Sequence, residues 1–155
     1  MPPRLRRCRA TLAFAPQYPC TKDVTLAVEP IPRTNTSEYI VRGDGVIVQR
    51  IVSRERQTLH DARENARMFN LLAGGRKRQL IVDMQVPYST GPGVREFYAS
   101  EEGSRYVSAL AMVTYSTTTS MIGNFFLSIN RPSYPCRMFT NLASANGWLR
   151  TLRGD

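Results

Sequence analysis

The chain of 155 residues has a single histidine, His60, and only three cysteines, Cys8, Cys20 and Cys136. The cysteines are far apart and form no Cys-x-x-Cys pair, and their odd number does not suit a disulfide framework. A zinc site would need several closely spaced Cys or His ligands, which the sequence does not offer. We therefore expect reduced thiols and neither a metal site nor another cofactor.

Patterns for nucleophilic catalysis and nucleotide binding are also missing. With one histidine, in the first turn of a predicted helix, no Ser-His-Asp or Cys-His arrangement can be assembled, and we interpret Cys136 as a core residue. Gly74-Gly75 precedes Arg76, Lys77 and Arg78, but the phosphate-loop spacing is absent. The glycines end a predicted helix, whose C-terminal end repels anions. The sequence therefore favours a protein that is not an enzyme.

No apolar run approaches the length of about 20 residues that a membrane-spanning helix needs. The longest runs, such as residues 109–113, are much shorter. The basic residues at the start of the chain precede only a weak apolar patch at 10–15, which ends at Pro16 and is a poor match to a secretory signal. We expect a cytoplasmic protein without a membrane span.

Positive charge and proline concentrate at the start of the chain. Residues 1–35 carry six Lys/Arg, two Asp/Glu and six of the ten prolines, and residues 36–155 carry fifteen Lys/Arg and ten Asp/Glu. Only residues 24–28 of the first segment suggest a strand. The sequence predicts a basic, proline-rich extension over 1–35, which need not fold, followed by one domain over 36–155. Such a tail attracts nucleic acid weakly and without sequence preference, although a solubilising leader is the favoured interpretation.

The domain begins with the pattern of a β-hairpin. Alternating β-branched runs at 38–42 and 46–52 flank Gly43-Asp44-Gly45, and Asp-Gly favours a tight turn. A helix follows, with Thr58 and Asp61 as a capping box and an apolar face that ends at Gly74-Gly75.

Strand and helix patterns then alternate to the end of the chain. Apolar runs predict strands at 79–84, 107–114 and 136–139. Helical spacing predicts a helix from Pro92, a second one capped within 117–120, and a third one capped by Thr140. The order predicts an α/β fold, with an N-terminal β-hairpin followed by alternating β/α elements in a mostly parallel mixed sheet on which the helices pack.

Several strings share the pattern of one family. The first predicted helix ends in Gly74-Gly75, and the strand after it ends in Asp83. The string VREFY at 94–98 starts another helix, and IGNFFLSIN at 122–130 leads through prolines to Phe139-Thr140. Over residues 38–150 the sequence resembles uncharacterised bacterial STAS-like proteins, SpoIIAA-like and of the STAS/SEC14 type, which are related to the anti-sigma-factor antagonists.

This resemblance implies a regulatory or protein-binding module. In the antagonists proper, a kinase phosphorylates a Ser or Thr where the helix after the central strand begins. The corresponding position here falls within Gly91 to Gly93, which has no hydroxyl. Ser89 and Thr90 are the nearest hydroxyls, and we interpret them as turn-forming and N-capping residues beside Pro92. The resemblance thus implies the fold without the phosphoacceptor.

Three hypotheses of function remain open. The leading one is a protein-binding surface formed by the loop after the central strand and the following helix, with Asp83, Ser89, Thr90 and Arg95 close to the contact; a homodimer is one form of it. Asp83 is expected to accept hydrogen bonds from its own loop or to pair with an arginine such as Arg95, rather than to orient a ligand. The second is a pocket for a small apolar or lipid-like ligand, lined by Phe125, Phe126 and Trp148. The third is nucleic-acid binding through the basic tail.

Overall fold

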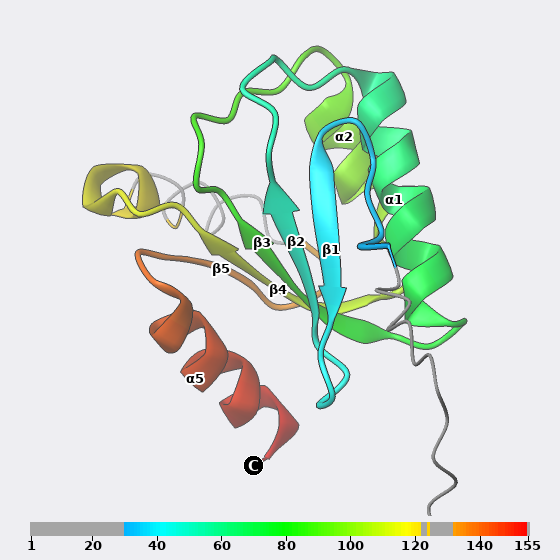
Figure 1. The fold of residues 1–155 in the computed structure, drawn as a ribbon. Coiled ribbons are helices and arrows are strands. Elements are labelled where there is room, and N and C mark those ends of the chain that lie inside the picture. The colour runs from blue at the N-terminus through cyan, green and yellow to red at the C-terminus, as the bar shows by residue number, and fades with distance from the viewer. Residues whose placement is uncertain (1–29, 122–123, 125–131, 155) are drawn as a thin grey trace, which may run out of the picture.

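The computed structural model describes residues 30–121, 124 and 132–154, and Figure 1 shows their arrangement. In chain order the elements are β1 (Ser37–Val41), β2 (Ile47–Ile51), α1 (Leu59–Ala73), β3 (Arg78–Asp83), α2 (Val94–Ala99), α3 (Glu101–Ser104), β4 (Val107–Val113), β5 (Cys136–Phe139) and α5 (Leu142–Arg153).

The strands form one five-stranded sheet in the order β1-β2-β3-β4-β5. β1 and β2 are antiparallel, with Val41 opposite Ile47 beside the turn, and the other neighbouring pairs are parallel. In the turn, Gly45 has a φ of 82°, a conformation that favours glycine. The predicted fold class, a β-hairpin followed by alternating elements around a mixed sheet, is confirmed.

Helices cover both faces of the sheet (Figure 1). On one face, α1 packs through Phe69 and Ala73 against β-strand residues such as Ile47 and Leu80. Residues Ala62 and Ala66 of α1 also pack against Val94 and Phe97 of α2. The apolar stripe predicted for α1 therefore faces the core.

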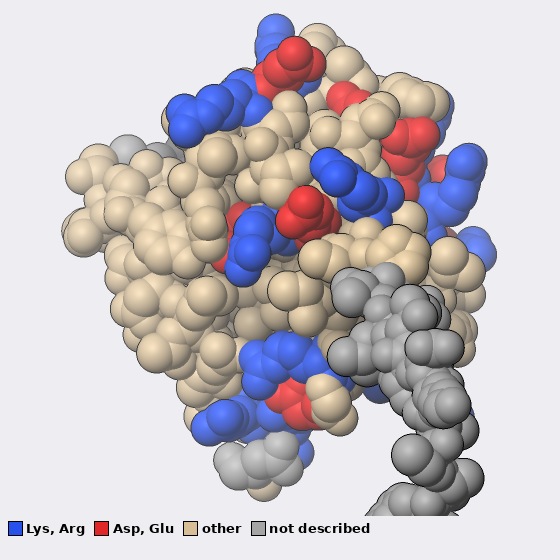
Figure 2. All heavy atoms as spheres, in the orientation of Figure 1, with Lys and Arg blue, Asp and Glu red and all other residues tan. Residues whose placement is uncertain are grey.

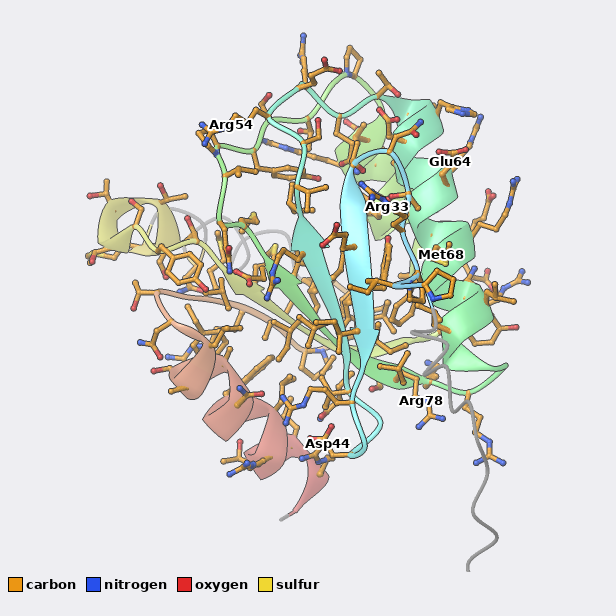
Figure 3. The ribbon with its side chains drawn as sticks, in the orientation of Figure 1. Arg33, Asp44, Arg54, Glu64, Met68 and Arg78 are labelled. Atoms are coloured by element: carbon orange, nitrogen blue, oxygen red, sulfur yellow. The ribbon has the colours of Figure 1, made fainter. Side chains whose placement is uncertain are left out.

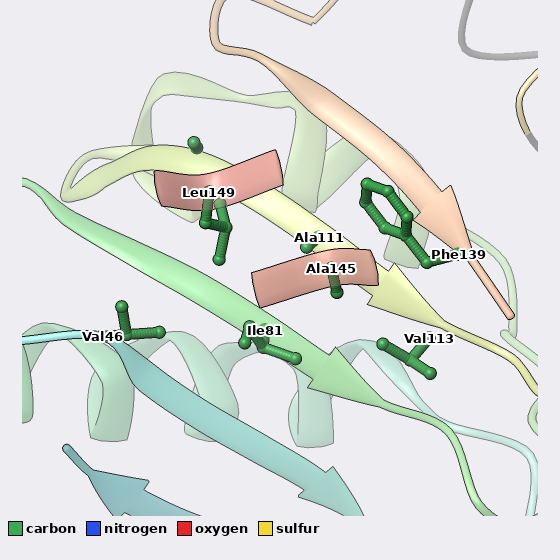
Figure 4. Packing of buried hydrophobic residues seen from close by; sticks show 8 residues of the cluster. Val46, Ile81, Ala111, Val113, Phe139, Ala145 and Leu149 are labelled. Atoms are coloured by element: carbon green, nitrogen blue, oxygen red, sulfur yellow. The ribbon is translucent and has the colours of Figure 1, made fainter. Parts of the chain in front are cut away.

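The other face is covered by α5. Ala145 and Leu149 pack against Ile81, Ala111 and neighbouring strand residues, as Figure 4 shows. Gln79 Nε2 also donates a hydrogen bond of 2.8 Å to the Leu149 carbonyl and so ties β3 to α5. The ring centroids of Phe139 and Trp148 lie 5.5 Å apart, which places half-buried Trp148 beside the core.

Three of the predicted helix starts differ by a few residues. The N-cap of α5 is Asn141, not Thr140, because the Asn141 side chain accepts from Ser144 N at 2.8 Å. Ser116, one residue before the predicted range, accepts from Thr119 N. Pro92 lies just outside α2, whose N-cap is Gly93. At the starts near Ser116 and Asn141, short polar side chains stand side by side, so sequence alone does not select the one that caps; α2 has no side-chain cap at all.

The capping of α1 agrees with its prediction. The Thr58 side chain accepts from Asp61 N at 3.2 Å, and the Asp61 carboxylate accepts from Thr58 N at 2.8 Å. At the other end, Gly74 adopts the left-handed conformation with a φ of 61°. Both ends of the helix are therefore closed by local hydrogen bonds.

Residues 117–121 and Asn124 are helical, between β4 and β5. The Asn124 side chain accepts from Met138 N at 2.9 Å and donates to Met138 O at 3.1 Å. One amide thus pairs with the outer edge of β5, as a neighbouring strand would. Phe125 and Phe126, predicted to be core or pocket residues, lie outside the described residues.

The start of the described chain is hydrogen-bonded to the domain. Tyr39 N donates to Pro32 O at 2.8 Å, and Thr34 Oγ1 donates to the buried Asn65 side chain. Residues 1–29, which form most of the predicted extension and include Cys8 and Cys20, lie outside the described residues. The boundary at residue 36 stays a prediction.

Candidate functional site

Asp83 ends β3 at the carboxyl edge of the parallel strands, the edge where open α/β sheets bind their ligands. Its side chain is fully buried, and Oδ2 accepts a hydrogen bond of 2.9 Å from Gln85 Nε2 in its own loop. Arg50 Nε, on the paired position of β2, lies 3.6 Å from the same oxygen. Asp83 therefore has the structural role that was expected of it.

Two expectations for Asp83 are corrected. Its arginine partner is Arg50 rather than Arg95, because the parallel register places Arg50 beside it, whereas Arg95 lies on α2. Because it is fully buried, Asp83 also cannot contact a partner directly. Its exposed neighbour on this edge is Arg50, whose side chain is 41% exposed.

Tyr115 adds a residue to this edge that the sequence did not indicate. It follows β4 with a φ of 57°, a left-handed conformation that is uncommon for a tyrosine. Partial burial raises the pKa of its phenol, and hydrogen bonding to Asp83 and the Asp83 charge raise this pKa further. Because this pKa is raised, the phenol stays neutral at neutral pH; the ring itself is half exposed and lies beside the Arg50–Asp83 pair.

The loop after β3 is fastened to the loop after β2. Gln57 N donates to Ser89 O at 3.0 Å, and Gly91 N donates to Gln57 O at 2.8 Å. Arg56 Nε donates to Thr90 O at 3.1 Å. These bonds hold residues 89–91 in an extended segment alongside residues 56–57.

Gln57 anchors both loops from inside the protein. Its side chain is buried, accepts from Tyr88 Oη and donates to Tyr98 Oη at 3.0 Å. Burial is the largest cause of the raised pKa values of both tyrosines, so both phenols stay neutral and can donate. Each polar end of the Gln57 amide thus has a partner, which allows it to be buried at low cost.

The predicted site residues of this loop differ in their surroundings. Ser89 and Arg95 are exposed, and Thr90 is half-buried. Neither hydroxyl caps α2, because Gly93 occupies the N-cap without a side-chain hydrogen bond and with a φ of 76°. The capping interpretation of Ser89 and Thr90 is therefore wrong. Their backbone carbonyls, rather than their hydroxyls, hold the loop.

The other side chains considered for catalysis or metal binding, Cys136 and His60, do not form a site with each other in the structure. Burial raises the pKa of the Cys136 thiol to about 12, which keeps it protonated and unreactive at neutral pH. His60 is exposed on α1, with Nε2 3.5 Å from Glu64 Oε1. In the part of the chain that the structure describes, no three Cys, His, Asp or Glu side chains gather closely enough to hold a metal ion.

The profile of a family described as a domain of unknown function, DUF7793, matches residues 39–153. The chain belongs to this family. The matched DUF7793 domain runs from within β1 to the last residue of α5 and so includes β2 to β5 in full and the carboxyl edge of the parallel strands. A comparison with curated proteins found no match.

The DUF7793 domain is also similar to one solved structure, the crystal structure of an uncharacterized protein of the DUF3478 family from Shewanella loihica PV-4, which has a SpoIIAA-like fold. The TM-score is 0.49 at 12% sequence identity, over 77% of this chain and 90% of that chain. Within the described ranges, no helix is both long and apolar enough to cross a membrane.

Proposed function

We propose that the DUF7793 domain is a non-enzymatic regulatory module that binds another protein through its carboxyl edge. The partner surface consists of the loop at 84–93, the start of α2 and the neighbouring Arg56. The observation that carries this proposal is the pair of main-chain hydrogen bonds between Gln57 and residues 89 and 91. These bonds fix a loop in which Ser89 is exposed, and Arg95 is exposed on α2 directly after it.

A loop held in this way suits recognition. Association costs free energy whenever a flexible loop must be ordered, and a loop already fastened to the domain avoids much of that cost. Here the fastening uses backbone atoms and the buried Gln57 side chain. The exposed side chains of the loop therefore remain available to a partner while the backbone beneath them stays in place.

The charges of this surface suit a protein partner better than a polyanion. Glu55 precedes Arg56, Glu96 follows Arg95, and all four side chains are exposed. In Figure 2, Lys/Arg and Asp/Glu side chains are interspersed over the upper part of the molecule. Charges of both signs give register and specificity to a protein interface, whereas they repel part of a uniformly charged ligand.

Site-specific photo-crosslinking in native extract tests the proposal. A photoreactive amino acid at position 89 should trap a discrete partner protein, and the same group at the exposed Ala143 of α5 should not. Arg95→Glu should abolish the product at position 89, whereas the matched reversal Arg63→Glu on α1 should leave it unchanged. Equal products from positions 89 and 143, or a product indifferent to Arg95→Glu, would contradict the proposal.

A further inference from the structure

Most of the net positive charge of the described domain lies at one edge of the sheet. The described residues include fifteen Lys/Arg and nine Asp/Glu. Seven of the cations lie at the amino edge, where the parallel strands begin and where the β1–β2 turn is. The acids of this region are Asp44 in the turn and Glu101 and Glu102 in α3, which precedes Arg105. We name these cations the basic edge: Arg42, Arg76, Lys77, Arg78, Arg105, Arg150 and Arg153.

Four separate segments of the chain supply the basic edge. Arg42 lies in the hairpin turn, residues 76–78 lead into β3, Arg105 lies before β4, and two arginines lie in the last turn of α5. Arg78 N donates to Tyr106 O at 2.8 Å, which brings the starts of β3 and β4 together. Figure 3 shows Asp44 and Arg78 at this end of the molecule.

Asp44, the acid of the hairpin turn, is already engaged. Its Oδ2 lies 2.8 Å from Arg42 Nη2 and 3.6 Å from Arg153 Nη1. The Arg78 guanidinium instead lies over Gly45, where an added Cβ would be 2.7 Å from its Nη1. The positive charges of the basic edge thus greatly exceed what Asp44 can neutralise.

A groove of about 360 Å³ opens at the same edge. Lys77, Arg78 and Arg153 line it, and Val46, Ala109, Pro135 and Leu152 supply apolar surface between them. Large aliphatic side chains also project close to the basic edge. Val41 ends β1, Leu71 is in the last turn of α1 and Leu152 is in the last turn of α5; they are 51%, 74% and 45% exposed.

We propose that the basic edge binds an anionic phospholipid surface. Arginine guanidinium groups donate paired hydrogen bonds to phosphate, and each cation near an acidic membrane adds to the attraction. The exposed aliphatic groups can enter the boundary between headgroups and acyl chains, where they gain free energy by leaving water. This surface lies opposite the loop at 84–93, so either proposal can fail without the other.

Nucleic acid shares the phosphate chemistry but fits this edge less well. Single strands are bound through exposed aromatic side chains on which bases stack. The only large aromatic residue of the described chain with high exposure is Tyr115, which follows β4 at the opposite edge. A phosphate backbone would also leave the apolar groove lining and the projecting aliphatic groups without a partner. An amphiphilic surface accounts for both features.

Vesicle binding by the full chain tests whether the positive charge of the basic edge is needed for membrane binding. The double variant Arg76→Glu/Arg105→Glu and the control Arg63→Glu/Arg67→Glu have the same net charge, and all four arginines are exposed. With vesicles containing phosphatidylglycerol, the edge variant should bind about a hundredfold more weakly than the wild type. The control should bind nearly as tightly as the wild type. Equal losses in both variants, or no loss in either, would overturn the proposal.

A second measurement separates lipid from nucleic acid. Leu71→Ser/Leu152→Ser should remove the vesicle binding that persists at high salt, while Val52→Ser/Met121→Ser, at exposed apolar positions elsewhere, should retain it. Duplex DNA provides the comparison in the same buffers. If the wild type binds DNA more tightly than vesicles at equal phosphate concentration, and only DNA binding depends on Arg76 and Arg105, nucleic acid is the partner and the proposal is wrong.

Discussion

Arg50 Nε lies 3.6 Å from Asp83 Oδ2, and the two residues occupy paired positions on the parallel strands β2 and β3. The Asp83 side chain is fully buried, whereas that of Arg50 is 41% exposed. The Asp83 Oδ1 and Arg50 Nε atoms are themselves buried without a hydrogen-bond partner in the described structure. Asp83 therefore relies on Arg50 to balance its buried charge, whereas water also reaches the guanidinium of Arg50.

This asymmetry predicts unequal costs of substitution. Arg50→Met leaves a buried carboxylate without its cation and should lower the free energy of unfolding by about 2 kcal/mol. Asp83→Asn leaves a guanidinium that water can still reach, and should cost about 1 kcal/mol. In urea unfolding, Arg50→Met/Asp83→Asn should be more stable than Arg50→Met alone. A double variant whose loss equals the sum of the single losses would show that the two side chains do not interact.

The capping box of α1 predicts a stability that depends on acid. Thr58→Ala should lower the free energy of unfolding by about 1 kcal/mol at neutral pH, because the Asp61 amide loses its acceptor and the Asp61 carboxylate loses its hydrogen bond from the hydroxyl. Hydrogen bonds from the Thr58 side chain and backbone hold the pKa of Asp61 below its usual value. Asp61 therefore stabilises the fold above its unfolded pKa, and this contribution is lost as the pH falls through its folded pKa.

Urea unfolding at about pH 6 and at about pH 2.5, the latter below the ordinary pKa range of carboxyl groups, checks this prediction. The free energy of unfolding should differ less between the two pH values in Thr58→Ala than in the wild type. Thr58→Ser keeps the accepting hydroxyl and serves as the control. Parallel pH profiles for wild type and Thr58→Ala would show that the hydrogen bonds do not act through Asp61.

Two helical glycines predict opposite results for the same substitution. A Cβ on Gly103 would lie 2.1 Å from Phe97 O and 2.8 Å from Phe97 C, at the junction of α2 and α3. Gly103→Ala should therefore cost about 2–3 kcal/mol, because backbone must move. A Cβ on Gly147 of α5 would meet nothing within 4 Å, so Gly147→Ala should stabilise the protein by about 0.5–1 kcal/mol. Thermal unfolding compares the two, and a stable Gly103→Ala variant would contradict the close packing of α2 and α3.

The burial of Cys136 predicts slow thiol chemistry. In the background Cys8→Ser/Cys20→Ser, Cys136 is the only thiol. Because burial raises its pKa to about 12, labelling by a disulfide reagent at about pH 8 should be at least tenfold slower in native protein than in urea. Native labelling as fast as that of the unfolded chain would show that the thiol is accessible and ionised.

Local sequence patterns predicted most of the fold, because a helix cap or a turn is formed by residues only a few positions apart in the chain. Thr58 and Asp61 are three residues apart, and Gly74 follows the last apolar turn, so both ends of α1 were visible in sequence. The resemblance to STAS-like proteins pointed to the same strand and helix order. The starts of α2 and α5 were shifted by one or two residues, because α2 begins at a glycine without a side-chain cap and Asn141 stands beside the equally suitable Thr140.

The candidate site was predicted less completely. The sequence placed Ser89 in the loop after the central strand and Arg95 on the helix that follows, but it misassigned the arginine partner of Asp83. Gln57, which fastens that loop, and Tyr115, which stands beside Asp83, had no signal in sequence. An isolated polar or aromatic residue shows its role only when the register of distant strands and loops is known.

The sequence by itself determined the elements, their order and the mixed α/β class, because capping, turn and periodicity depend on residues close together in the chain. Tertiary structure alone decided that Arg50 meets Asp83, that Gln57 joins two loops, and that seven cations from four segments share one edge. Charge and hydrogen bonding act through space. Their consequences for function therefore depend on the strand register that brings these segments together.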